Sequence, residues 1–154
     1  MSLVAVVRPD SWNVALFVHV LGAMILVGAL VASAGLLALA RGDGRLLRFG
    51  YWSLLGAAVP GWVLLRVGAE WISSKEGWND LPSGVDTPTW LDIGGIAADG
   101  GGVILLVALV FGGIGVRRMR QGGGAGLLRA TLVLTTVLLA LDVVAVWAMA
   151  GKPS

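Results

Sequence analysis

The sequence predicts an all-α fold, an integral membrane four-helix bundle, and three observations indicate it. Hydrophobic residues make up 57% of the 154 residues, and charged residues only 13%, roughly half the charged share of a soluble domain. Four long apolar stretches alternate with short charged or glycine-rich segments. The chain also holds 24 glycines, a residue that is more frequent in transmembrane helices than in soluble ones. We therefore expect residues 1–154 to form a single transmembrane domain.

The first apolar stretch, residues 12–40, contains no acid, lysine or arginine, and its one titratable side chain is His19. A bilayer core of about 30 Å needs roughly 20 helical residues, so this stretch can span it with tilt. Backbone groups in lipid must be paired within the segment, which requires a helix. Pro60 and Gly61 predict a kink in the second helix. The other predicted helices cover residues 49–71, 88–116 and 127–149, with an outer loop at 72–87.

The distribution of lysine and arginine predicts how the bundle is oriented in the membrane. The connections between helices one and two and between helices three and four carry seven arginines, whereas the other side carries three cations. Cytoplasmic loops are enriched in Lys and Arg, so both termini and the 72–87 loop should lie outside, an N-out/C-out topology. Tryptophan prefers the membrane interface, and the predicted outer helix ends carry Trp12, Trp71, Trp90 and Trp147.

Each predicted helix contributes one ionisable side chain to the same layer of the outer leaflet. Measured from the tryptophans at about 1.5 Å per residue, the four residues lie roughly 8–14 Å deep. An isolated charge facing lipid costs about 2.5–3.5 kcal/mol on insertion scales. We therefore expect them to converge on the bundle interior as a ligand or ion site. The four are His19, Arg66, Asp99 and Asp142.

Helical periodicity adds supporting residues on the same faces. Glycines there would let a neighbouring backbone or a ligand approach closely, and Arg66 is within reach of Glu70 at i+4. The supporting positions are Gly22 with His19; Trp62 and Glu70 with Arg66; Asp92, Gly95 and Gly102 with Asp99; and Thr131, Thr135 and Leu138 with Asp142.

Several functions fit these residues, and the sequence leaves them open. The site can hold a proton or a small polar ligand, because acid–histidine sets serve proton relays in membranes. It can hold a divalent metal such as Zn, Mn or Fe(II) through His19, Asp99 and Asp142. Alternatively, Arg66 pairs with Asp99 or Asp142 in a purely structural network of a non-catalytic assembly or accessory subunit. A haem is a further candidate, since Gly22 leaves a gap beside His19 for a flat macrocycle.

Enzymatic activity is not expected, because no nucleophile triad can be traced in the chain. The net charge of +2 requires no nucleic-acid partner. The lipid bilayer is the expected partner, together with a homodimer or a larger membrane complex. A small-xxx-small pattern, Gly28 to Ala32, offers the first helix a second contact face for such an assembly.

The stretch VALFVHVLGAMILVGALV, residues 14–31, resembles the first helix of small bacterial four-helix membrane proteins of the copper-resistance D type and related integral membrane families. His19, Gly22 and Gly28 carry the resemblance. It implies metal or haem handling, or a role not yet known, and a multi-pass location in a bacterial inner membrane. The single histidine and the lack of a methionine cluster depart from what copper transport needs.

Overall fold

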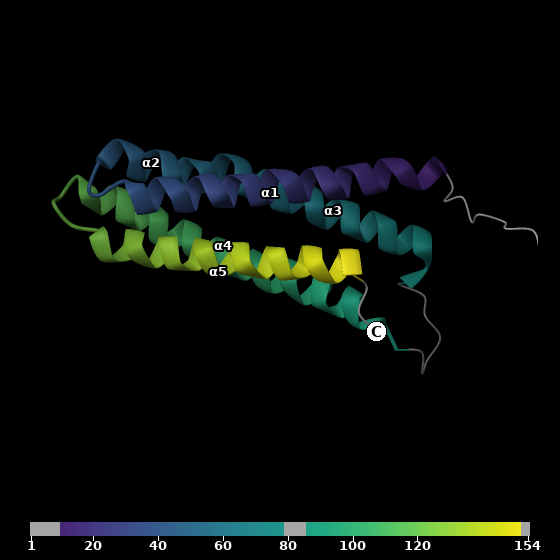
Figure 1. The fold of residues 1–154 in the computed structure, drawn as a ribbon. Helices are drawn as coiled ribbons and strands as arrows, with labels where there is room; N and C mark the ends of the chain where they lie inside the picture. The colour runs from purple at the N-terminus through teal and green to yellow at the C-terminus, as the bar shows by residue number, and fades with distance from the viewer. Residues whose placement is uncertain (1–9, 79–85, 152–154) are drawn as a thin grey trace, which may run out of the picture.

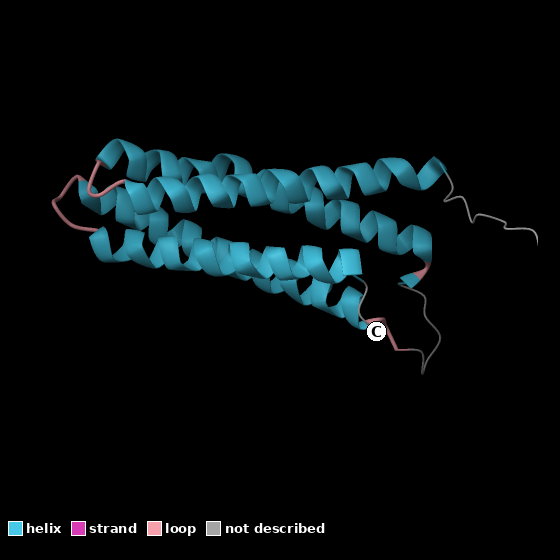
Figure 2. Ribbon diagram, in the orientation of Figure 1, coloured by secondary structure: helices cyan, strands magenta, loops and turns pink. Residues whose placement is uncertain are grey.

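The computed structural model describes residues 10–78 and 86–151, and every element in these ranges is helical (Figures 1 and 2). Four segments are long and apolar enough to cross a membrane: α1, the continuous segment Gly44–Glu76, α4 and α5. The predicted all-α four-helix bundle is therefore confirmed. The elements are a 3-10 turn Asp10–Trp12, α1 Asn13–Leu39, α2 Gly44–Ser53, a π-helical segment Leu54–Ala58, α3 Val59–Glu76, α4 Thr89–Met119 and α5 Ala125–Gly151.

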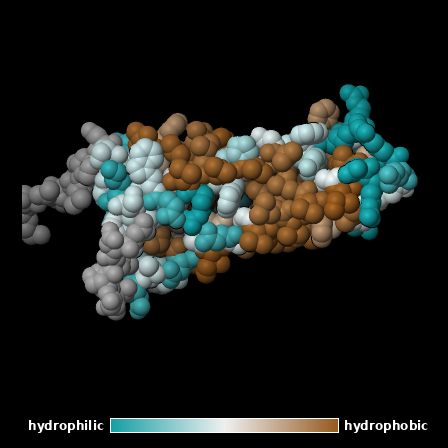
Figure 3. Space-filling model, turned by 180° about the vertical axis from the view of Figure 1, so that it is seen from behind, coloured by the Kyte–Doolittle hydropathy of each residue, from teal (hydrophilic) through white to brown (hydrophobic). Residues whose placement is uncertain are grey.

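The helices alternate in direction along the bundle, which places the two short connections together at one end (Figure 1). We call this the arginine end, because the seven arginines of the α1–α2 and α4–α5 segments gather there. The start of α1, the α3–α4 connection and the end of α5 lie at the opposite end, here called the outer end. A hydrophobic band separates the two ends (Figure 3). The side of the membrane that each end faces stays a prediction from the arginine count.

The second spanning segment is longer than predicted at both of its ends. It begins at Gly44, where the carboxylate of Asp43 accepts the backbone N–H of Arg45 at 2.7 Å and caps the helix. It ends at Glu76, followed by Gly77 in the left-handed conformation at φ +76°, which is a common way to stop a helix. Residues 72–76 of the predicted outer loop at 72–87 are therefore helical, and its residues 79–85 lie outside the described ranges.

A π-helical segment lies where the sequence predicts a kink. Pro60 has no backbone N–H and cannot donate to the carbonyl four residues before it. The preceding residues, Leu54–Ala58, form a π-helical turn in which the N–H of Val59 donates to the carbonyl of Leu54. The wider turn changes the hydrogen-bond pattern just before the proline, so the segment continues to Glu76 without ending there.

Glycines bring α1 and α3 into backbone contact. A Cβ atom built on Gly61 would lie 2.7 Å from the backbone nitrogen of Leu26, and one on Gly68 would lie 2.5 Å from that of His19. A Cβ on Gly22 would overlap the backbone nitrogen of Leu65. Side chains larger than hydrogen would therefore force the two helices apart, as at small-residue interfaces of other membrane helices.

The second close pair is α4 with α5, again through small residues on α4. Gly115 faces Leu128, Gly112 faces Thr131, and Gly101 faces Leu138. The two pairs meet in one apolar core. Its buried members are Leu26, Ala29, Leu30, Leu54, Ala58, Leu105 and Leu138.

Candidate functional site

His19 lies on α1 where that helix touches α3. The close approach at Gly68 brings the imidazole Nδ1 to 3.0 Å from the carbonyl oxygen of Leu65. A carbonyl oxygen only accepts hydrogen bonds, so Nδ1 carries the hydrogen and Nε2 is left as the basic ring nitrogen. The histidine is partly buried, and it is hydrogen-bonded to the backbone of α3 at Leu65, the residue before Arg66.

Arg66 pairs with two carboxylates, Glu70 on its own helix and Asp99 on α4. Its Nη1 lies 2.9 Å from Oε1 of Glu70, and its Nε lies 3.1 Å from Oδ1 of Asp99. We call Arg66, Glu70 and Asp99 the ionic cluster. The Arg66 side chain is 34% exposed, while those of Glu70 and Asp99 are 55% and 66% exposed. The cluster therefore lies at the surface of the bundle, where the guanidinium of Arg66 forms ion pairs with two carboxylates.

Trp62 makes a second bridge between α3 and α4, one turn before Arg66. Its indole Nε1 donates to the carbonyl oxygen of Ala98 at 2.8 Å. The ring lies against Gly102, where an added Cβ would come within 2.5 Å of it. Gly102 therefore allows a close approach, but the approaching group is the indole of Trp62 and not the backbone or ligand that the sequence predicts.

Asp142 lies apart from the ionic cluster, on the buried face of α5. Thr131, Thr135 and Leu138 share this face and are likewise buried, as the stripe predicts. Asp142 is 9% exposed, and its Oδ2 has no hydrogen-bond partner among the described residues. Leu138 packs against Gly101 of the antiparallel α4. One further turn of α5 therefore brings Asp142 to the level of Ala97 and Ala98, in the layer of the Trp62 bridge.

The structure thus decides which acid pairs with Arg66. The sequence leaves Asp99 and Asp142 as equal candidates at similar depth, and the ion pair forms with Asp99. All four predicted residues lie toward the outer end. His19, Arg66 and Asp99 are linked through neighbouring positions of α3, and Asp142 lies at the level of Ala97 and Ala98, next to Asp99 in the chain. They do not converge on one interior point, because Asp99 is exposed whereas Asp142 is buried.

The predicted face of α4 is wrong in its outer part. Asp92, Gly95 and Asp99 are exposed, and the buried face begins at Ala97. Two residues turn a helix by about 200°, so a face centred on Ala97 points Asp99 away from the core. Asp92 instead accepts the hydroxyl of Thr87 at 2.6 Å beside the start of α4. The buried positions of α4 are Ala97, Gly101, Gly102, Leu105, Ala108, Gly112 and Gly115.

The arrangement does not support the metal or haem sites that the sequence suggests. Within residues 10–78 and 86–151, no group of three or more His, Cys, Asp or Glu side chains could hold a metal ion. His19, Asp99 and Asp142 are therefore not assembled as ligands. The gap expected beside Gly22 is filled by the backbone of α3 at Leu65, which leaves no space there for a flat macrocycle.

Two elements of the site could not be found from the sequence, the carbonyl oxygens of Leu65 and Ala98. Both accept a hydrogen bond from a side chain of another helix. Every residue except proline offers the same backbone acceptor, so no sequence signal marks these two. In Figure 3, hydrophilic residues interrupt the hydrophobic surface in the half remote from the arginine end.

Comparison of the chain with protein-family models, with curated proteins and with solved structures finds no match. The resemblance of residues 14–31 to copper-resistance D proteins therefore stays a prediction. What the structure establishes is a small polytopic membrane protein with ionisable residues inside its spanning segments.

Proposed function

We propose that this chain is a multi-pass membrane protein that binds and releases protons at the carboxylates of its outer half. The observation that carries the proposal is the charge balance of the layer. Arg66 is one cation shared by Glu70 and Asp99, and Asp142 adds a third acid with an unpartnered oxygen. Hydrocarbon does not solvate unbalanced charge. Protons are the simplest species that can complete this balance.

Access to the cluster supports exchange with the outer side. Glu70 is adjacent to Trp71, an exposed tryptophan at the expected interface. Asp99 lies deeper on the spanning surface, so its link to the outer side runs through its contact with Arg66. Arg66 connects the two, so a proton that arrives at Glu70 changes the electrostatic environment of Asp99 through a shared partner.

His19 adds a proton-binding group beside the cluster. Its Nδ1 is fixed by the carbonyl of Leu65, next to Arg66 in the chain. Nε2 is the ring nitrogen that a proton can join. Carboxylates with a nearby histidine are the usual components of membrane proton relays.

A proton is favoured over a divalent metal by the same contacts. Arg66 already occupies one oxygen each of Glu70 and Asp99. A metal would have to displace the guanidinium or compete with its charge. A small cationic ligand would satisfy the charge balance as a proton does, and it should therefore compete with proton binding.

A non-catalytic assembly subunit is the second candidate, and one observation favours it. Glu70 and Asp99 are more than half exposed on a membrane-spanning surface, where contact with lipid is costly. A partner chain that covers the cluster would remove that cost. Under this proposal the ionic cluster holds the partner and need not exchange protons.

Proton counting on the purified protein separates the two candidates. In neutral detergent, we expect proton uptake between about pH 8 and about pH 5, a range in which an ordinary aspartate is already ionised. Asp142→Asn should reduce this uptake, because it removes the buried carboxylate whose Oδ2 has no hydrogen-bond partner among the described residues. Asp86→Asn is the matched control, because Asp86 is exposed outside the helices, and it should behave as wild type. If both variants match wild type, the proton proposal is wrong and the assembly subunit is favoured.

A further inference from the structure

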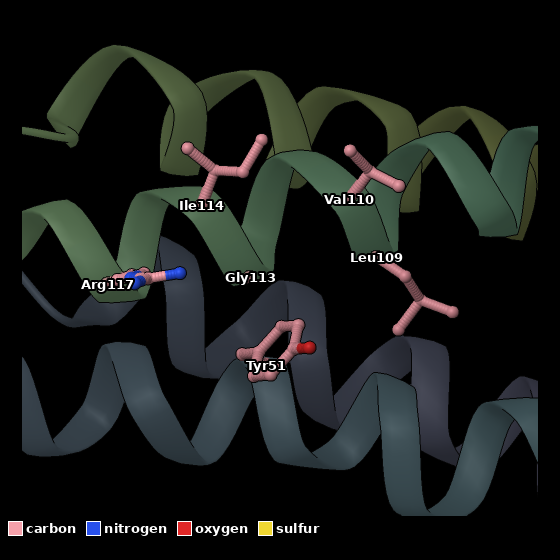
Figure 4. A pocket seen from close by; sticks show the side chains of 6 residues that line it. All are labelled: Tyr51, Leu109, Val110, Gly113, Ile114 and Arg117. Atoms are coloured by element: carbon pink, nitrogen blue, oxygen red, sulfur yellow. The ribbon is translucent and has the colours of Figure 1, made fainter.

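A groove of about 420 Å³ opens between α2 and α4 in the half of the bundle near the arginine end (Figure 4). Tyr51 stands on α2 opposite Gly113 of α4, with Leu109 toward one end of the groove and Arg117 toward the other. An added Cβ on Gly113 would lie 3.1 Å from the Tyr51 hydroxyl oxygen. The lack of a side chain at Gly113 therefore leaves the space that forms the groove. Val110 and Ile114 complete the lining.

The groove changes from apolar to cationic along α4. Leu109 and Arg117 are eight positions apart, or about 12 Å along a helix axis. Arg117 lies in the last turn of α4, beside the α4–α5 connection at the arginine end. Val110 and Ile114, by contrast, are exposed apolar residues within the spanning segment. This order matches a lipid in the bilayer, whose acyl chain lies deeper than its headgroup.

The charge of the arginine end favours an anionic headgroup. The segments that form this end carry seven arginines and one acid, Asp43. The carboxylate of Asp43 accepts a backbone N–H, and no ion pair to Arg117 occurs in the part of the chain that the structure describes. A second hollow of about 410 Å³, lined in part by Arg48 and Arg120, extends the cationic surface at the same end.

We propose that this groove binds an anionic phospholipid, with an acyl chain along Leu109, Val110 and Ile114 and the phosphate at Arg117. Basic pockets between transmembrane helices bind anionic headgroups in this way. A soluble phosphate would leave the apolar lining uncovered, and a zwitterionic lipid would leave the guanidinium charge unbalanced. The site lies in the opposite half of the bundle from the ionic cluster and is independent of the proposed proton binding.

Native mass spectrometry of the protein in neutral detergent, titrated with phosphatidylglycerol, tests the charge contact. Arg117→Gln should weaken binding of the first lipid by about fivefold, the effect of one arginine near an anionic headgroup. Arg118→Gln is the matched control, because it removes the same charge from the same helix end outside the groove lining. It should bind within about twofold of wild type, because Arg118 lies about 100° further around the helix axis and does not line the groove. Equal losses in both variants would overturn the groove assignment.

A second pair of variants tests the acyl part of the groove without changing charge. Val110→Trp should fill the groove and weaken phosphatidylglycerol binding, whereas Val103→Trp, at an exposed α4 position outside the lining, should not. Circular dichroism checks that all variants remain helical. Equal binding of phosphatidylcholine would overturn the anionic preference. Equal binding of glycerol phosphate, which has no acyl chain, would show that the site takes a soluble anion and overturn the lipid assignment.

Discussion

The contact between α1 and α3 predicts that Gly68→Ala destabilises the bundle while Gly28→Ala does not. The methyl group of Gly68→Ala would start 2.5 Å from the backbone nitrogen of His19. Non-bonded heavy atoms pack at about 3.5 Å, so α1 would have to move away by about 1 Å. Gly28 is also in a spanning helix, but no atom lies within 4 Å of its Cβ position.

The expected difference follows from two costs that only Gly68→Ala incurs. Overpacking of a close contact costs about 1–3 kcal/mol. Separating the helices also lengthens the 3.0 Å bond from His19 to the Leu65 carbonyl, and such bonds in membranes contribute about 0.6 kcal/mol on average. Both variants gain similar helix propensity, up to about 1 kcal/mol, so this gain cancels. We expect Gly68→Ala to be about 2–3 kcal/mol less stable than Gly28→Ala, from the sum of these costs.

Reversible unfolding in mixed micelles, followed by circular dichroism, measures this difference. The helices of the bundle themselves supply the circular-dichroism signal, so no added probe is needed. If Gly68→Ala were as stable as Gly28→Ala, then α1 and α3 would not be in backbone contact at this level. The position assigned to His19 beside Leu65 would then also be wrong.

Three further predictions follow from the contacts around Arg66 and from the topology. Arg66→Met combined with Asp99→Asn should lose less stability than the sum of the single variants, by about 1 kcal/mol, whereas Arg66→Met with Asp142→Asn should be additive. Trp62→Phe should cost about 0.6 kcal/mol, and at most about 1.7, through loss of the bond to Ala98; an unchanged unfolding midpoint would argue against that bond. An activity reporter fused beyond α5 should report an extracytoplasmic location, and a cytoplasmic signal would reverse the orientation.

The number and type of the helices could be predicted from the sequence because hydropathy and length decide them directly. The α5 face of Thr131, Thr135, Leu138 and Asp142 was also predictable, since polar residues at helical spacing in an apolar segment favour one buried stripe. The π-helical segment before Pro60 was not. A proline shows where the hydrogen-bond pattern must change, but a kink and a π turn both satisfy that need.

The sequence predicted the level at which the candidate-site residues lie along the helices. It did not predict which way their side chains point around the helix axes. Counting residues from the tryptophans gives the level of a side chain, and the structure places Arg66 and Asp99 together at one level. On α4, however, small residues occupy several faces, so glycine spacing did not reveal which face packs against α5. Asp99 consequently points outward to Arg66, whereas Asp142 on α5 is buried. Only the packing of the helices against one another decides such directions.

The protonation state of the spanning carboxyl groups tests the central claim most directly. Difference infrared spectroscopy detects the carbonyl band of a protonated carboxyl group and its shift in heavy water. With one cation, Arg66, against three acids, Glu70, Asp99 and Asp142, we predict that this band is present at neutral pH and that it weakens in Asp142→Asn. A wild-type protein with no such band at neutral pH, in which all three acids are ionised, would contradict the account.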